Sequence, residues 1–191
     1  MGSVCQEIYE RRFIRGVNMK NSYEVRGDTA AIFIKCKGRI LETLISIEDL
    51  EVVKSFPNTW YGYWVKRRQT YIVAGNLPWK KGEKRKRELL HRWIMNPEKD
   101  MVVDHINFNT LDNRRGNLRI LTNAQNSQNR KGPPKNNSSG YMGVHRRESG
   151  KYIAYLYSQH KRVYLGTFET AEKAYRAVLE KRRDLMPFSQ L

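Results

Sequence analysis

Aspartate, histidine and asparagine side chains recur at short intervals between Met101 and Lys131. Asp104 and His105 end an apolar run that predicts a strand. Asn126 follows on a segment that predicts a helix. A carboxylate and a carboxamide offer oxygen ligands to a hard divalent cation, and an imidazole can take a proton from water. If the three side chains converge, the pattern predicts a metal centre that activates water.

A hairpin folded back onto a helix would bring these side chains together. The predicted elements are a strand ending at His105, a polar turn over 107–116, a strand over 118–121 and a helix capped by Thr122 or Asn123. Asn126, Asn129 and Arg130 recur at helical spacing and would share one helix face. The alternative is an ordinary strand end and turn, because Asp, His and Asn are common there.

The stretch resembles the HNH nuclease motif in its phage homing-endonuclease form, with Asp104-His105 followed by Asn117 and Asn126. The resemblance implies that Asp104 and Asn126 are the metal ligands and that His105 is the general base. It also implies that Asn117 holds the hairpin loop so that His105 points correctly. Many such proteins have a histidine where this chain has Asn126, so the asparagine favours magnesium or manganese over zinc or nickel.

Several arginines flank the predicted centre and are candidates for clamping DNA phosphates. Alternatively, they are solvated surface residues. They are Arg114, Arg115, Arg119 and Arg130.

Charge and composition favour a nucleic-acid partner. The chain has 191 residues, a formal net charge of +17 and a pI near 10.0, which indicates a polyanionic partner. A membrane surface is the weaker alternative, because apolar runs are short and no signal peptide is recognisable. Two cysteines provide neither a disulfide framework nor a four-cysteine zinc site, so we expect a protein of a reducing cytoplasm, that of a phage's bacterial host.

The predicted fold class is α+β. We expect a tail over 1–22 and a DNA-contacting domain over 23–87. This domain would be a small antiparallel sheet with one helix that starts at Ser46. The nuclease domain would span 88–131 and begin with a helix, Glu88 to Met95. His91 lies on this helix and is expected to be a packing or hydrogen-bonding residue; the alternative is that His91-Arg92 contacts a phosphate near the cut. The basic run KKGEKRKR precedes the domain and can be a phosphate clamp, a nuclear localisation signal or a solvated face.

A Pro-Asn-Ser stretch over 132–139 predicts a linker, after which 140–187 predict three antiparallel strands packed on one helix capped by Thr170. One sheet face would cover the helix. The other would carry cations and tyrosines suited to a major groove: His145, Arg147, Tyr155, Tyr157, Arg162 and Tyr164. This region resembles the apetala-two domain of plant ethylene-response factors in the segments GYMGV, GKYIA and LGTF, and the resemblance implies that these six residues face DNA.

Together, these features predict a metal-dependent endonuclease of the phage HNH homing type. It would bind double-stranded DNA at a specific site and nick one strand as a monomer, because the chain has one such centre. An alternative is a sequence-specific DNA-binding protein or repressor that keeps the motif as a remnant. Binding to structured RNA is a further alternative.

Overall fold

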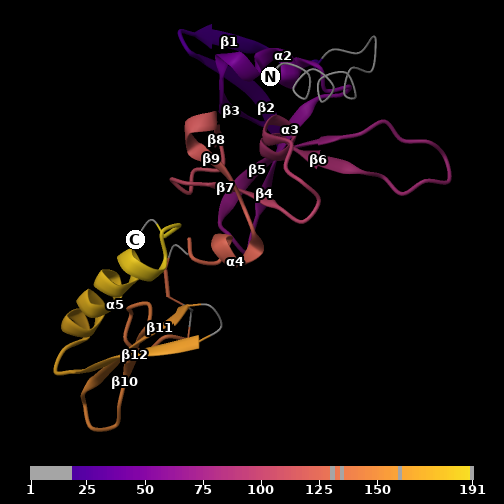
Figure 1. Cartoon of the computed structure of the whole chain (residues 1–191). Helices are drawn as coiled ribbons and strands as arrows, with labels where there is room; N and C mark the ends of the chain where they lie inside the picture. The colour runs from indigo at the N-terminus through magenta and orange to yellow at the C-terminus, as the bar shows by residue number, and fades with distance from the viewer. Residues whose placement is uncertain (1–18, 130–131, 134–135, 159–160, 190–191) are drawn as a thin grey trace. The chain divides into compact units, whose positions relative to one another are not determined.

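The structure is a computed structural model that describes residues 19–129, 132–133, 136–158 and 161–189 (Figure 1). Two compact units divide between Ile120 and Leu121. The predicted α+β class is confirmed, since both units combine β-strands with helices. In the described residues, no helix has the length and apolarity needed to cross a membrane.

A mixed sheet organises the first unit. Within the described residues it has seven strands, in the order β6-β5-β4-β2-β3-β8 with β1 paired to β2. Their bounds are β1 Tyr23–Arg26, β2 Thr29–Cys36, β3 Arg39–Ser46, β4 Trp60–Val65, β5 Thr70–Asn76, β6 Arg87–Leu89 and β8 Asp112–Asn113. The helical segments of this unit are η1 (Ile47–Asp49), α2 (Leu50–Lys54), α3 (Leu90–Met95) and η2 (Arg115–Asn117).

The prediction of a small antiparallel N-terminal sheet was wrong in two respects. β2 pairs with β4, and β3 with β8, in parallel. In addition, β6 and β8 come from the region next to or inside the predicted nuclease segment. The first residues of the helix predicted from Glu88 are extended instead, because Leu89 pairs with Ala74 of β5. Long-range pairing here overrides local helix propensity.

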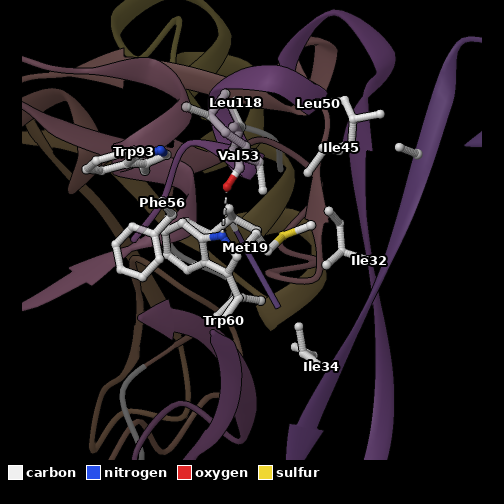
Figure 2. Packing of buried hydrophobic residues seen from close by; sticks show 14 residues of the cluster. Met19, Ile32, Ile34, Ile45, Leu50, Val53, Phe56, Trp60, Trp93 and Leu118 are labelled. Atoms are coloured by element: carbon white, nitrogen blue, oxygen red, sulfur yellow. Dashed lines mark hydrogen bonds between the residues drawn. The ribbon is translucent and has the colours of Figure 1, made fainter. Parts of the chain in front are cut away.

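Aromatic residues at the centre of the first unit connect α2 and α3 to the sheet (Figure 2). Phe56 stacks on Trp60 with ring centroids 3.9 Å apart, and Trp93 meets Phe56 edge-on at 5.2 Å. The Trp60 indole donates a hydrogen bond to the Val53 carbonyl. A side chain at Gly75 would lie 2.2 Å from Phe56, so the ring requires glycine on β5. This core fixes α3 against the sheet.

A two-stranded ladder joins β7 (Val102–His105) to β9 (Leu118–Leu121). Both strands were predicted, and β9 has the predicted bounds. Between them, β8 adds to the edge of the large sheet beside β3, with Leu44 opposite Asp112 and Ile45 opposite Asn113. The hairpin that carries His105 is therefore attached to the first unit by backbone pairing.

The second unit contains α4 (Asn123–Asn126), β10 (Val144–Arg146), β11 (Tyr152–Ser158), β12 (Lys161–Phe168) and α5 (Ala171–Leu185). The predicted three-stranded antiparallel sheet packed on one helix is confirmed. Thr170 caps α5 as expected, by accepting a hydrogen bond from the Lys173 amide. Val144, Ala154 and Leu156 are buried against that helix. Asn137 and Ser139, in the predicted linker, hydrogen-bond to the Val144 carbonyl.

Candidate active site

His105 lies at the end of β7, and 6% of it is exposed. Its Nε2 lies 3.1 Å from Oδ1 of Asn113, which is itself buried on β8. Asn113 Nδ2 donates to Thr43 Oγ1 at 2.8 Å, and the Thr43 hydroxyl donates to the Leu111 carbonyl at 2.7 Å. The imidazole is thus connected through an asparagine to the large sheet.

The partners of Asn113 select one tautomer of His105. Asn113 Nδ2 also points at the Thr110 carbonyl, 3.4 Å away, and a carbonyl can only accept a hydrogen bond. The amide oxygen of Asn113 therefore faces the imidazole, so Nε2 of His105 must carry the proton. The other ring nitrogen, Nδ1, then has the lone pair that a general base uses.

Asn117 closes the loop between β7 and β9. Its Oδ1 accepts from the Asn107 amide at 2.9 Å, and its Nδ2 donates to the Asp112 carbonyl at 2.8 Å. Its own carbonyl accepts from the Ile106 amide. One buried side chain therefore bridges both sides of the loop that leaves His105, which is the arrangement that a loop-holding residue needs.

Asp104 of β7 forms an ion pair with Arg119 of β9. Arg119 Nη2 lies 2.9 Å from Asp104 Oδ2, and its Nε lies 3.1 Å from the same oxygen. The two side chains are 15% and 16% exposed. A carboxylate oxygen next to the candidate base thus already has a cationic partner within the protein.

Burial lowers the pKa of both histidines in this region. For His105, burial lowers the pKa. It outweighs the hydrogen bond that Nε2 donates to Asn113 and the nearby charges of Asp104 and Asp112, all of which raise the pKa. The His91 ring meets the His105 ring edge-on, with centroids 5.0 Å apart. Burial, followed by the charges of His105, Arg92 and Arg68, lowers the pKa of His91 to about 3. Both imidazoles are therefore neutral at neutral pH.

His91 should make the folded protein less stable in acid. Its folded pKa of about 3 lies below its ordinary value of 6.5, so protons bind the unfolded chain more readily. The stability from neutral His91 is complete above pH 6.5 and is lost as pH falls toward 3. Between about pH 7.5 and pH 5, the free energy of unfolding measured in urea should fall by about 2 kcal/mol more in the wild type than in His91→Gln. An equal loss in both proteins would contradict this.

The predicted phosphate-clamp arginines contact carboxylates of the first unit. Arg114 binds Asp112 through two contacts of 2.8 Å, and Arg115 binds both oxygens of the buried Asp49. Arg119 is the partner of Asp104 described above. The side chains of Arg114 and Arg115 are nearly half exposed, so solvent reaches part of each guanidinium. Arg130 lies outside the described residues.

Asn126 is the last residue of α4 and belongs to the second unit. Thr122 and Gln125 form a capping box at the start of α4, as the predicted cap at Thr122 requires. The helix is shorter than the predicted one, because a turn follows Asn126 and places Asn129 beyond the helix. The meeting of Asn126 with Asp104 remains a prediction.

The open face of the C-terminal sheet gathers most of the predicted DNA-facing residues. Tyr155 lies opposite Tyr164, and Tyr157 opposite Arg162. The Arg162 guanidinium lies 4.6 Å from the centroid of the Tyr155 ring. Tyr157 and Tyr164 are 63% and 58% exposed. His145 is exposed on β10, and Arg147 is exposed just after it. A cation and several tyrosines therefore share one solvent-facing surface.

Sequence reasoning missed Asn113 and left His91 out of the catalytic residues. Asn113 stands in the polar stretch between the two predicted strands, where asparagine is ordinary turn chemistry. Its partners Thr43 and His105 lie 70 and 8 residues away. The available signal was the sequence Asp112-Asn113, which sits inside the resemblance to the nuclease motif without matching one of its named positions.

Comparison with known proteins finds a match in the segment that contains His105. No curated protein and no solved structure matches the chain. Residues 88–128 match a family model described as HNH endonuclease. The matched range includes α3, β7, β8, β9 and α4, and so contains His91, Asp104, His105, Asn117 and Asn126. Over residues 88–128, the chain is therefore similar to the HNH endonuclease family.

Proposed function

We propose that the chain is a metal-dependent, site-specific DNA endonuclease of the phage HNH homing type. It would nick one strand of duplex DNA as a monomer. The observation that carries this proposal is the fixed imidazole of His105, held by Asn113 beside Asp104 in the segment that matches the HNH family. The net charge of +17 suits a polyanionic substrate.

His105 would act through Nδ1. Because Nε2–H is directed at Asn113, Nδ1 would take a proton from a water molecule placed in line with the scissile phosphorus. The water oxygen would bond to phosphorus while the bond to the 3′ oxygen breaks. The products would be a 5′ phosphate and a 3′ hydroxyl. Burial keeps the imidazole neutral, which is the form that a base needs.

The chemistry of the donor set fits a hard divalent cation, magnesium or manganese. Asp104 would supply a carboxylate oxygen and Asn126 a carboxamide oxygen. The described residues contain no cluster of three or more His, Cys, Asp or Glu side chains able to hold an ion. The two oxygens of Asp104 and Asn126 suit a cation that keeps several water ligands, as magnesium usually does. When bound, such an ion would stabilise the leaving 3′ oxygen and the charge on the phosphate.

Site recognition would come from the second unit. The open sheet face with Tyr155, Tyr157, Arg162 and Tyr164 would lie in a major groove, as in the apetala-two domain that the sequence resembles. His145 and Arg147 would add polar contacts at its edge. Arg114, Arg115, Arg119 and Arg130 would contribute phosphate contacts around the cut. One catalytic centre per chain would then give one cut per binding event.

Asn113 should matter for catalysis through the imidazole that it holds. Asn113→Leu removes the acceptor for Nε2–H and frees the ring to change tautomer, so cleavage should slow about 10–100-fold. The rate with a duplex substrate at saturation measures this, with DNA binding as the control. Asn113→Asp keeps an acceptor for Nε2–H but loses the donor to Thr43, so its rate should lie between those of Asn113→Leu and the wild type. Equal losses in both variants would contradict a positioning role.

A second candidate is a DNA-binding protein or repressor whose nuclease motif no longer cleaves. The ion pair between Asp104 and Arg119 favours it, because a carboxylate already neutralised by a guanidinium is a weaker ligand for a cation. The intact set of Asp104, His105 and Asn126 favours the enzyme, because a binding protein does not need all three.

Incubation with supercoiled plasmid DNA separates these candidates. In magnesium or manganese, the nuclease should convert the plasmid to the nicked circle, and a chelator should stop the conversion. A repressor would retard the plasmid in a gel without changing its topology. Conversion that persists in the chelator would count against the metal-dependent mechanism.

A further inference from the structure

A basic hairpin extends from the large sheet between β5 and β6 (Figure 1). The strands pair up to Asn76 and Arg87, and the Leu77 amide donates to the Lys86 carbonyl at 3.0 Å, which continues the ladder. Figure 1 shows this segment, Leu77 to Lys86, reaching away from the rest of the sheet. We name it the basic arm.

The tip of the basic arm has a defined conformation. The Glu83 amide donates to the Lys80 carbonyl, and Gly82 between them has a φ of +94°, which a glycine adopts readily. The Trp79 indole N–H donates to the Glu83 carbonyl at 2.6 Å. The Arg85 guanidinium lies 5.1 Å from the centroid of the Trp79 ring. Indole and guanidinium thus hold the turn together.

The basic arm and Arg87 after it concentrate positive charge. Residues 79–87 contain six Lys or Arg residues and one carboxylate, Glu83, and all nine are exposed. Like charges so close together repel one another, and a polyanion relieves that repulsion. Trp79, which is 47% exposed, is a single aromatic residue and not an apolar patch of the kind that inserts into lipid. A row of phosphates is the ligand that fits.

We propose that the basic arm grips the phosphate backbone of duplex DNA and supplies affinity independently of the cleavage chemistry at His105. This rests on the proposed function to the extent that DNA is the partner. Lysine ammonium groups contact phosphates without reading bases, so the arm adds affinity and not sequence choice. Its contribution should therefore appear in the salt dependence of binding.

The test uses the full chain with His105→Ala, which binds without cutting, in a buffer without divalent cations. The arm variant adds Lys80→Gln, Lys81→Gln, Lys84→Gln and Lys86→Gln. It keeps Arg85 over Trp79 and Arg87 over the Tyr63 ring, so the packing of the hairpin is retained. Each lost phosphate contact lowers the slope of log K against log salt by about 0.9, so the slope should fall by about 2 to 4. Affinity for a short duplex should fall roughly 10–100-fold at moderate salt.

The matched control replaces four exposed lysines outside the basic arm with glutamine. They are Lys20, Lys35, Lys99 and Lys173. It should keep a slope closer to that of the parent. Equal slopes in the arm variant and the parent, or an equal loss in the control, would overturn the proposal. The proposal would also be overturned if the arm variant lost more affinity for duplex RNA of the same sequence than for duplex DNA.

Cleavage by the chain with His105 intact separates this proposal from the proposed function. The arm substitutions should leave the rate at saturating DNA unchanged and raise the DNA concentration needed for half of that rate. If neither protein cuts DNA, the nuclease assignment fails, yet the binding comparison still decides the role of the arm. A fall in the saturated rate to the level of His105→Ala would overturn the arm's independence from the chemistry.

Discussion

Replacing His105 by alanine should lower the rate of DNA cleavage about 10²–10⁴-fold, the contribution typical of a positioned general base. DNA binding should change little, because the imidazole is buried and donates its N–H to Asn113 and not to a ligand. Single-turnover cleavage of a duplex, with binding measured in parallel, tests both statements. Loss of binding together with cleavage would show that His105 mainly supports the fold or the DNA contact.

His91→Gln is the matched control for this substitution. It removes a second, partly buried imidazole whose ring centroid lies 5.0 Å from that of His105. His91 has no assigned chemical role, so the variant should retain most of the cleavage rate. A loss as large as that of His105→Ala would mean that the pair of imidazoles, and not His105 alone, performs the proton transfer.

Asp104→Asn should lower cleavage at least about 10²-fold, because it removes the charged ligand that would hold the cation beside the phosphate. The carboxamide has nearly the shape of the carboxylate and can still accept a hydrogen bond from Arg119, so the fold should be kept. Titration with manganese, followed by the electron paramagnetic resonance signal of the free ion, measures binding directly. The variant should bind manganese much more weakly than the wild type.

Arg119→Gln distinguishes a metal ligand from a structural ion pair. Arg119 approaches Asp104 Oδ2 to 2.9 Å and competes with a cation for that carboxylate. If Asp104 is a ligand, Arg119→Gln should retain cleavage and bind manganese at least as tightly as the wild type. If Asp104 serves only to hold Arg119, the two substitutions should reduce cleavage equally.

Local pattern was sufficient for much of the fold. Leu118–Leu121 has the predicted bounds, since alternation and turn residues are properties of neighbouring positions. The Thr170 cap and the buried Ala174 and Val178 of α5 follow from helical spacing. Parallel pairing of β3 with β8 did not follow, because the paired segment of β8 has two residues and its partner lies far back in the chain.

Only part of the candidate site could be predicted from the sequence, for the same reason. The motif indicated Asp104, His105 and Asn117, whereas the residue that fixes the imidazole, Asn113, depends on a hydrogen bond to Thr43 across 70 residues. Arg182 gives a second example. It lies near the end of α5, is 4% exposed and donates to the Gln128 carbonyl at 2.7 Å, a contact across 54 residues of the chain. Only the folded chain brings such partners together.

Mapping the ends of the cleavage product tests the central claim, hydrolysis of a DNA phosphodiester at the His105 centre. The purified chain would cut a duplex in magnesium or manganese, and the product would be sequenced from both ends. The same reaction in water enriched in oxygen-18 would show which new terminus receives the oxygen of water. The account predicts a break in one strand with a 3′ hydroxyl and a 5′ phosphate that carries the heavy oxygen. A 3′ phosphate, label on the 3′ end, or no break dependent on His105 would contradict it.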